Sequence, residues 1–495
     1  MRSLSEDVYD VFIIGAGISG IGCACHLKEK HPGKRWAILE SRDDLGGTWD
    51  LFKYPGIRSD SDLYTFSYKF RPWSSPNAIA SAEEIKSYMN DTVDHYGVRD
   101  SIHYGHRVLE VEWQSHTALW MLLLDTPQGQ IRVKSKWVFS ATGYYDYREG
   151  YRPEFLNEEL FQGEIIHPQL WPEKLDYTGK KVVVVGSGAT AVTLIPELAK
   201  RAAHVTQLQR TPSYVLSRPR KDPLASALSK IAPAKVVHSI TRWKNTRQQR
   251  LFYAFCQQFP GLARKMLTSG VRNQLPPSYD VDLHFNPPYD PWDQRLCAVP
   301  DGDYFKAVSN GAASVVTGGI ERFTENGIVM TSGASVEADI VILATGLKVK
   351  LFDGIPITVD GARVSIPDCF VYRGCMLSGV PNFNFAIGYT NSSWTLKVDL
   401  VCEYFCDLIS ELDSTGAAIC VPKGPSLNTQ SKPLFDFQAG YVKRSAHLLP
   451  KQGDQFPWTM SSDYVLDQRE FTKKPALGVD LTILPKPVVC AEATV

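Results

Sequence analysis

The first strong hydrophobic pattern lies at residues 8–14, a β-branched apolar run that ends in glycines. A helix-compatible segment follows at 23–30, and a second apolar run at 36–39 ends on Glu40. This order of strand, turn, helix and strand predicts a βαβ unit with two parallel strands. The pattern therefore favours an α/β fold with a Rossmann-type domain in this part of the chain.

The turn between this strand and helix has the spacing Gly-x-Gly-x-x-Gly. The first glycine permits the tight turn, the second lets a pyrophosphate approach the backbone, and the third lets helix and strand pack closely. Amides at the helix N-terminus can then bind phosphate, and a carboxylate at the end of the second strand can accept hydrogen bonds from both ribose hydroxyls. We predict that an adenine dinucleotide with free ribose hydroxyls binds at Gly15, Gly17, Ser19, Gly20 and Glu40.

The same pattern recurs at residues 180–191, with Ala191 in place of the third glycine. A helix is expected at 192–201 and a strand at 205–209, which ends in Arg210-Thr211 rather than in an acid. An arginine pairs with a 2′-phosphate that a carboxylate would repel. Two dinucleotide sites with opposite ribose chemistry indicate a flavoprotein that uses NADPH. The predicted NADP site consists of Gly186, Ser187, Gly188, Thr190, Arg210 and Thr211.

Two further apolar runs, at 137–143 and 339–346, each end in Ala-Thr-Gly and lie on either side of the second unit. We interpret them as the points where the chain leaves the first domain and returns to it. The prediction is an FAD-binding domain with an inserted NADP-binding domain. The expected boundaries are 1–150 and 341–495 for the two parts of the FAD-binding domain, and 151–340 for the inserted domain.

A helical excursion is predicted at about 221–290, within the inserted domain. Apolar residues recur there at helical spacing, for example at Ile240 and Trp243. Residues 221–275 contain ten Lys or Arg and one acid, Asp222. We expect a solvated basic face; the alternatives are a lid over the substrate pocket or a weak peripheral contact with anionic lipid.

Composition excludes several classes of protein. The 495 residues include 53 basic and 53 acidic ones, so charge gives no reason to expect nucleic-acid binding. No apolar run reaches the roughly 18 residues that cross a bilayer, and the apolar run near residue 8 follows acids rather than a basic leader. Ten cysteines without a regular spacing favour free thiols and a cytoplasmic location. No metal site is predicted, because no His, Cys and acid cluster has ligand spacing.

Longer motifs then carry a resemblance to a known family. Residues 161–172 fit FxGxxxHxxxWP, and residues 46–60 fit GGxWxxxxYPGxxxD. Both patterns resemble those of type I Baeyer–Villiger monooxygenases, among the class B flavoprotein monooxygenases, and the similarity spans nearly the whole chain. Residues 291–297 and 388–397 are most similar to the shorter, ethionamide-activating branch of that family.

The resemblance implies an FAD-dependent monooxygenase that uses NADPH and O2 to convert a ketone into an ester or lactone through a C4a-peroxyflavin. It assigns to Arg295 the positive charge that keeps the peroxide anionic, which suits a guanidinium because it stays charged at any working pH. It assigns to Asp60 the orientation of Arg295; Asp60 alternatively caps a helix starting near Ser61. Further flavin-site positions implied by the second motif are Gly47, Thr48, Trp49, Tyr54 and Asp60, with Trp49 and Tyr54 expected to pack beside the flavin ring.

His167 is the residue of the first motif that invites interpretation as a general base. Its place in the linker into the NADP domain favours a hinge role instead, and the resemblance implies the same. Trp171 and Pro172 then stiffen this linker. The fingerprint set is Phe161, Gly163, His167, Trp171 and Pro172.

One position departs from the family pattern. Longer members commonly carry Lys-Arg where this chain has Gln294-Arg295, so recognition of the 2′-phosphate rests on Arg210 and Thr211. Oxygenation of sulfur or nitrogen in a thioether-like substrate remains an alternative, as do a pyridine-nucleotide disulfide reductase and a flavin-binding protein without turnover. The sequence predicts neither the natural substrate nor the oligomeric state.

Overall fold

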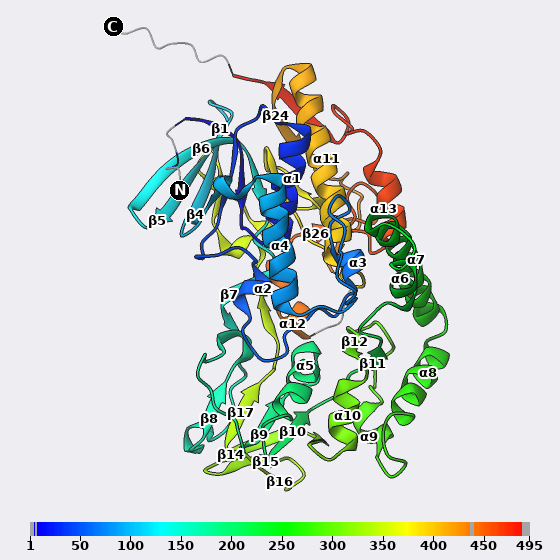
Figure 1. Ribbon diagram of the computed structural model, residues 1–495. Coiled ribbons are helices and arrows are strands. Elements are labelled where there is room, and N and C mark those ends of the chain that lie inside the picture. The colour runs from blue at the N-terminus through cyan, green and yellow to red at the C-terminus, as the bar shows by residue number, and fades with distance from the viewer. Residues whose placement is uncertain (1–3, 5–6, 436–439, 488–495) are drawn as a thin grey trace.

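Two large β-sheets, one above the other, organise the computed structural model, which describes residues 4, 7–435 and 440–487 (Figure 1). The upper sheet is mixed, and the lower one is parallel. The upper sheet contains the N-terminal βαβ unit. Its parallel part is formed by β3 (Ile102–His103), β2 (Trp36–Leu39), β1 (Tyr9–Ile14), β6 (Gly129–Ser140) and β23 (Phe383–Phe385). It extends through β5 (Leu119–Thr126), β4 (Arg107–Gln114), β19 (Ile357–Val359) and β20 (Ala362–Arg363), with β21 (Val371–Tyr372) and β22 (Met376–Leu377) joined through β23.

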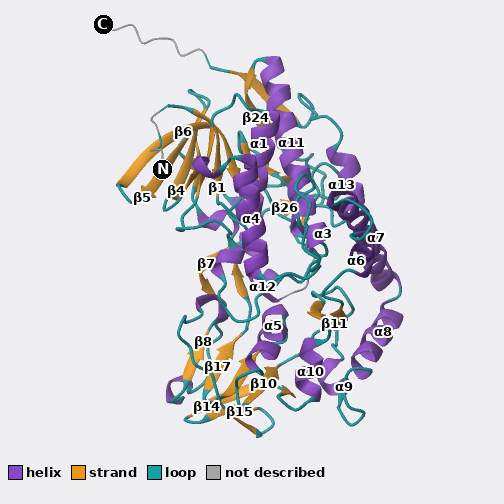
Figure 2. Cartoon of the chain, in the orientation of Figure 1, coloured by secondary structure: helices purple, strands orange, loops and turns teal. Residues whose placement is uncertain are grey.

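Helices cover one face of this sheet, and the antiparallel strands curl over the other (Figure 2). The covering helices are α1 (Ile18–Lys30), α4 (Ala82–Tyr96) and α11 (Trp394–Thr415). A helix starting at residue 23 was predicted, but α1 starts at Ile18, because the glycine turn leads directly into its first turn. The loop after β2 carries the short helices α2 (Thr48–Leu51) and α3 (Leu63–Phe66).

The lower sheet is parallel throughout and has the second βαβ unit at its centre. Its strands, in spatial order, are β13 (Ala313–Thr317), β10 (His204–Gln209), β9 (Lys181–Val185), β17 (Ile340–Leu343) and β8 (Glu164–Ile166). One face packs on α5 (Ala189–Leu198) and α10 (Asp303–Ser309), and the other on β14 (Ile320–Thr324), β15 (Gly327–Met330) and β16 (Ser335–Glu337). Helix α5 starts and ends about one turn before the predicted 192–201, since Ala199 already serves as its C-cap.

The chain crosses between the two sheets twice, and the two crossings lie side by side. β7 (Tyr145–Gly150) follows β6, β18 (Leu347–Val349) follows β17, and the two strands pair antiparallel. The Ala-Thr-Gly segments therefore stand at the start of both crossings. β17, from which the second crossing starts, lies inside the lower sheet between β9 and β8.

The basic excursion leaves the lower sheet after β10 and returns to α10. It contains β11 (Val215–Arg218), α6 (Pro223–Leu228), α7 (Ala234–Gln258), α8 (Pro260–Arg272), α9 (Val281–Phe285) and β12 (Cys297–Pro300), and β11 pairs with β12. Figure 1 shows α6, α7 and α8 along one side of the molecule, next to α13 (Tyr464–Phe471). The remaining elements are β24 (Ala417–Pro422), β25 (Lys432–Pro433), α12 (Gly440–Ser445), β26 (Lys451–Gln452), α13 (Tyr464–Phe471) and β27 (Leu481–Pro485). Among the described helices, none is both long enough and apolar enough to cross a bilayer.

Candidate active site

The first glycine turn is shaped so that only glycines fit its two closest contacts. Gly15 has φ +104°, and Gly20 packs so tightly that a Cβ there would lie 1.9 Å from the carbonyl oxygen of Gly15. No side chain caps the amides of the first turn of α1. By contrast, a capping box satisfies the N-terminus of α4, and Asp62 caps the N-terminus of α3. Uncapped amides at a helix N-terminus beside a glycine turn suit a bound pyrophosphate, so this cradle fits the dinucleotide part of FAD.

Glu40 lies at the end of β2, as the ribose-binding prediction requires, and it also braces the turn. Its side chain is buried, and its two carboxylate oxygens accept hydrogen bonds from the backbone N–H of Ala16 at 2.7 Å and of Arg42 at 2.9 Å. Burial raises the pKa of this carboxyl group despite these bonds. Its oxygens retain lone pairs that can accept further hydrogen bonds from ribose hydroxyls.

The motif at 46–60 wraps around the same turn. Gly47 lies against Gly17, since a Cβ at Gly47 would be 3.0 Å from the Gly17 Cα. Thr48 opens α2, and Trp49 packs edge-on against Phe66 with ring centroids 5.6 Å apart. The predicted first-cradle residues Gly47, Thr48 and Trp49 are therefore brought to the turn that contains Gly17.

Tyr54, from the same motif, packs in the core of the lower domain instead. It is buried in a cluster with α5 and β12 residues, and burial raises its pKa to about 12. The following Gly56 lies against α5, where a Cβ would meet the Glu197 side chain at 2.3 Å. Tyr54 thus joins the first-domain loop to the second domain.

The second cradle is a hollow of about 820 Å³ that all six predicted NADP residues line. α5 starts after Gly188 without a side-chain cap, and the space around the Gly188 Cβ position is open. Ser187 Oγ donates to the Thr211 carbonyl oxygen at 2.9 Å, which ties the turn to the end of β10. The chemistry of the lining fits the pyrophosphate and adenosine of NADP.

Arg295 lines the same hollow and forms an ion pair with a residue from the other domain. Its Nε lies 3.2 Å from Asp60 Oδ2, and both side chains are partly exposed. The Asp60 carboxylate raises the pKa of Arg295, although desolvation opposes it. The alternative role for Asp60 as a helix cap is wrong, because Asp62 caps α3 by accepting from the Thr65 N–H at 3.0 Å.

The fingerprint residues form the edge of the lower sheet and one crossing. Phe161 is buried against Phe323, and Gly163 lies against the Asp339 backbone, where a Cβ would be 2.2 Å from the carbonyl oxygen. Trp171 packs on the lower core, whereas Pro172 is exposed.

His167 has backbone partners on both ring nitrogens. Nε2 donates to the Gly346 carbonyl oxygen at 3.2 Å, and Nδ1 accepts from the Gln169 N–H at 3.2 Å. Desolvation lowers the pKa of His167. Its ring also fills the space over Gly150, so it contacts both crossings.

Sequence reasoning missed several aromatic residues around Arg295. Burial raises the pKa of the Tyr144, Tyr145 and Tyr441 phenols, and the nearby charge of Arg295 opposes this shift in all three. Tyr144 also stacks on Trp394 with ring centroids 5.2 Å apart. Trp394 Nε1 in turn donates to Ser19 Oγ at 2.9 Å, which connects this cluster to the first cradle. Tyr144 and Tyr145 directly follow the first Ala-Thr-Gly, a position that could have indicated them.

A second, small cavity of about 60 Å³ is also lined by Arg295. Within the described residues, Trp292 Nε1 and Asn391 Oδ1 are buried and have no hydrogen-bond partner. Gln249 and Phe252 of α7 also line this cavity. One donor and one acceptor without partners indicate a place for a small polar group of a ligand.

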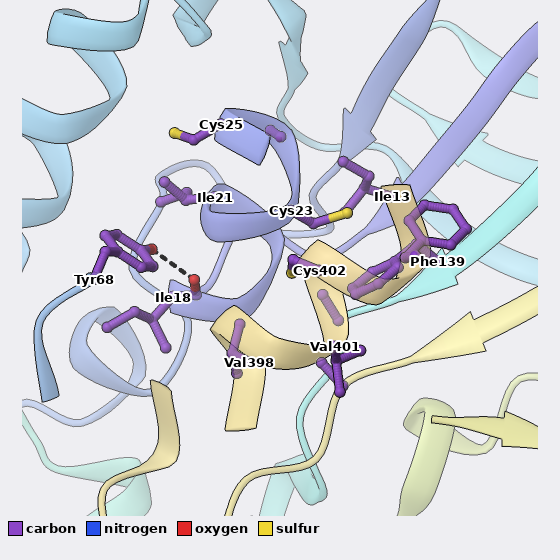
Figure 3. Close-up of a cluster of buried hydrophobic side chains, with 14 of the residues drawn as sticks. Ile13, Ile18, Ile21, Cys23, Cys25, Tyr68, Phe139, Val398, Val401 and Cys402 are labelled. Atoms are coloured by element: carbon purple, nitrogen blue, oxygen red, sulfur yellow. Dashed lines mark hydrogen bonds between the residues drawn. The ribbon is translucent and has the colours of Figure 1, made fainter. Parts of the chain in front are cut away.

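The buried cysteines argue against a disulfide reductase. Figure 3 shows Cys23 beside Cys402 among apolar side chains, with Cys25 on the other side of α1. Burial raises the pKa of Cys23 and of Cys25, which disfavours the reactive thiolate. In the described parts of the chain, no group of His, Cys or acids could hold a metal ion.

Known proteins share this chain's sequence and fold. A family model described as pyridine nucleotide-disulphide oxidoreductase matches residues 12–249. The FAD-containing monooxygenase EthA of Mycobacterium tuberculosis is 46% identical over 480 residues, which cover 94% of this chain and 98% of that protein. EthA of Mycolicibacterium smegmatis is 46% identical over 462 residues, covering 93% and 94%.

Solved structures have the same fold at lower identity. An oxidised steroid monooxygenase bound to NADP has a TM-score of 0.75 at 21% identity, covering 97% of this chain and all of that chain. An open form of cyclohexanone monooxygenase has a TM-score of 0.75 at 20% identity, covering 96% and 99%. OTEMO in complex with FAD and NADP has a TM-score of 0.68 at 22% identity, covering 84% and 88%. The chain therefore belongs to the family of FAD-containing monooxygenases that includes EthA, within the class B flavoprotein monooxygenases that the motifs predicted.

Proposed function

We propose that this flavin monooxygenase uses NADPH and O2 to insert an oxygen atom next to a ketone carbonyl, which gives an ester or lactone. The observation that carries the proposal is the Arg295–Asp60 ion pair, which joins the two domains at the hollow of the second cradle. FAD and NADPH are the cofactors: when bound, they supply the electrons and the activation of O2. The residues described here bind them, hold Arg295 and receive the substrate.

Arg295 supplies a fixed positive charge. A guanidinium that remains protonated favours negative charge on the oxygen atom that attacks a carbonyl carbon. Asp60 pairs with the Nε of Arg295, which leaves the N–H groups on Nη1 and Nη2 of the guanidinium for another acceptor. The surrounding phenols Tyr144, Tyr145 and Tyr441 have raised pKa values through burial, so they stay neutral and add no competing anion.

The small cavity beside Arg295 is the proposed position of the substrate carbonyl group. The Trp292 N–H can donate to a carbonyl oxygen, and apolar contact is available from Phe252 and Leu296. Because α7 supplies Gln249 and Phe252, the basic excursion forms one wall of this cavity.

Oxygenation of sulfur or nitrogen is the second candidate. Arg295 is already balanced one to one by Asp60, which weakens the field that an anionic oxygen donor needs. A soft nucleophile such as a thioether sulfur requires no such charge, so both activities can occur at this site.

Product analysis with matched variants separates the two candidates. Wild type, Arg295→Ala and the exposed control Arg272→Ala would each receive linear, cyclic and aryl ketones and thioethers, with NADPH or NADH. The expected result is ester or lactone from wild type and Arg272→Ala, and a loss of at least about a hundredfold in Arg295→Ala with flavin content and sulfoxide formation retained. Sulfoxide without any ester from wild type would favour the second candidate, and NADPH oxidation without either product would overturn both.

A further inference from the structure

A second arginine, distant in sequence, lines the NADP hollow. Arg444 of α12 and Arg210 at the end of β10 both belong to its lining. Sequence reasoning singled out Arg210 but not Arg444, because residue 444 lies beyond both βαβ units. Gln294, which stands where longer family members carry lysine, lines the same hollow.

Arg444 is held in place by an aromatic platform. Its guanidinium carbon lies 3.5 Å from the ring centroid of Tyr151, a stacked cation–π contact. The backbone of Tyr151 is fixed in turn: its N–H donates to the Gly346 carbonyl oxygen at 2.9 Å, and its carbonyl accepts from Thr345 Oγ1 at 2.5 Å. Both partners lie on the second crossing, so the position of Arg444 is set by the junction of the domains.

Neither arginine has a counter-ion among the residues that the structure describes. In this part of the chain no acid lies within 4.0 Å of the Arg210 or Arg444 guanidinium, and Glu154 is the carboxylate among the described residues that line the hollow. Burial and the repulsion from Arg210 lower the pKa of Arg444. Two like charges that face one hollow without a bound acid favour an anionic ligand between them.

The location identifies the anion. The pyrophosphate of a dinucleotide lies at the N-terminus of the helix after the glycine turn, whereas the adenosine ribose lies at the end of the second strand. That end is Arg210. We infer that Arg444 and Arg210 together bind the 2′-phosphate of NADPH, with Arg444 taking over the role of the lysine that Gln294 replaces.

Binding measurements test this inference without turnover. Titration calorimetry would give the Kd of NADP⁺, NAD⁺ and 2′,5′-ADP for the FAD-loaded wild type, Arg444→Gln and the exposed control Arg363→Gln. We expect Arg444→Gln to weaken NADP⁺ and 2′,5′-ADP about tenfold or more, to leave NAD⁺ within about twofold, and Arg363→Gln to change neither. Equal weakening of NADP⁺ and NAD⁺, or no weakening of 2′,5′-ADP, would overturn the inference.

A restoring substitution keeps the test independent of folding. Gln294→Lys in the Arg444→Gln background should recover most of the NADP⁺ affinity, because it returns a cation to the lining of the hollow. Arg444→Lys should keep an intermediate affinity, since it retains the charge but loses the stacked fork. Failure of both variants to bind NADP⁺ more tightly than Arg444→Gln would contradict the proposed role.

An independent observation concerns the outer surface of α7 and α8. Large apolar side chains are exposed there: Trp243 is 60% exposed and Leu251 70%. We name this surface the α7–α8 face, formed by Ile240, Trp243, Leu251, Phe259, Leu262 and Met266, each at least 42% exposed. The opposite side of α7 is buried through Arg242 and Asn245, so the apolar residues are directed outward by helical periodicity.

The charged residues of the α7–α8 segment itself are all basic, and two acids from other segments, Asp463 and Asp290, pair with its Arg250 and Arg264. No Asp or Glu occurs at residues 223–279. Lys230, Lys235, Arg247 and Lys265 are exposed, and none of these four forms an ion pair within the described residues; Arg247 instead lies over the Trp243 ring, 4.6 Å from its centroid. Exposed Trp, Phe and Leu mixed with unpaired cations are typical of helices that lie in the interface of an anionic bilayer. We propose that the α7–α8 face docks on the surface of an anionic membrane, with the Arg295 cavity behind α7.

Vesicle flotation tests this docking. At low salt we expect wild type to float with phosphatidylglycerol vesicles and not with phosphatidylcholine vesicles, and added salt to release it. Trp243→Ser with Leu251→Ser should reduce the bound fraction at least fivefold, whereas Leu156→Ser with Leu427→Ser, at exposed apolar positions elsewhere, should not. No flotation with phosphatidylglycerol, equal loss in both double variants, or a dimer in light scattering that the Trp243/Leu251 variant dissociates would each overturn the proposal.

Discussion

At the residue scale, the Asp60 carboxylate connects the glycine motif of one domain to the guanidinium of the other. Asp60→Asn removes the carboxylate charge but keeps the size of the side chain. We therefore expect the Arg295 side chain to remain in the site but to lose its fixed orientation. Ester formation should fall about ten- to hundredfold through kcat, with flavin content unchanged. Steady-state kinetics measure this, and Asp62→Asn is the control, since asparagine still caps α3. An equal loss of kcat in both variants would mean that Asp60 supports the folded structure and does not specifically orient Arg295.

A buried histidine predicts how stability depends on pH. His238 is buried, its Nε2 lies 2.9 Å from Ser67 Oγ, and burial together with Arg242 lowers its pKa to about 4. As the pH falls below about 6.5, this histidine becomes protonated in the unfolded chain, whereas in the folded protein it stays neutral down to about pH 4. The free energy of unfolding is therefore highest above pH 6.5 and declines as the pH falls toward 4. Urea unfolding at pH 7 and 4.5 should show this loss, and His238→Gln should remove up to about 3 kcal/mol of it, unlike the exposed His116→Gln.

The site residues that could be predicted from the sequence are those whose role follows from their position relative to a nearby strand or helix. Gly15, Gly20 and Arg210 stand at fixed offsets from a strand, and the structure places each in its cradle. Arg444 was missed because its contact with Tyr151, far away in the sequence, is encoded by no spacing. Tyr144 was missed although it follows the first Ala-Thr-Gly, because its contact with Trp394 cannot be read from local order. Their role depends on the crossings, where segments distant in sequence meet.

At the element scale, α7 is attached to the upper domain by its polar side. Arg242 donates to the carbonyl oxygens of Tyr64, Thr65 and Ser67 and pairs with Asp399 at 3.2 Å, all in buried positions. The basic composition alone predicted a solvated face, and it did not distinguish this buried arginine from its exposed neighbours. The two sides of α7 therefore differ in role: the buried side anchors the helix to the upper domain, and the opposite side is exposed to solvent.

The anchor predicts a large difference between two arginines on the same helix. Arg242→Leu leaves Asp399 buried without its charged partner, which should cost about 3–5 kcal/mol in the free energy of unfolding. Arg250→Leu breaks an exposed pair with Asp463 and should cost less than about 1 kcal/mol. Denaturant unfolding of both variants measures the difference, and similar values would refute the anchoring role.

At the scale of the whole molecule, two domains are joined by two adjacent crossings and by side chains that reach across. Arg58 of the upper domain pairs with Asp303 of α10, and Tyr54 packs in the lower core. The motifs predicted two cradles and an insertion, since each βαβ unit is a local pattern. The pairing of β7 with β18 was not predictable, because neither short strand has a pattern that identifies its partner.

The crossings also decide how His167 acts. Both ring nitrogens bind backbone groups, one of them on the second crossing, so the ring has no free position for proton transfer. His167→Gln should lower the rate of ester formation and increase NADPH oxidation without product, because the two crossings lose their shared contact. The pH profile of kcat should keep its shape, since desolvation already holds the pKa of His167 below its ordinary value and the neutral ring is the one present at working pH. Rates of NADPH and O2 consumption against product, measured from pH 6 to 9, test this. Loss of the acidic limb of the profile in His167→Gln would instead identify His167 as the general base.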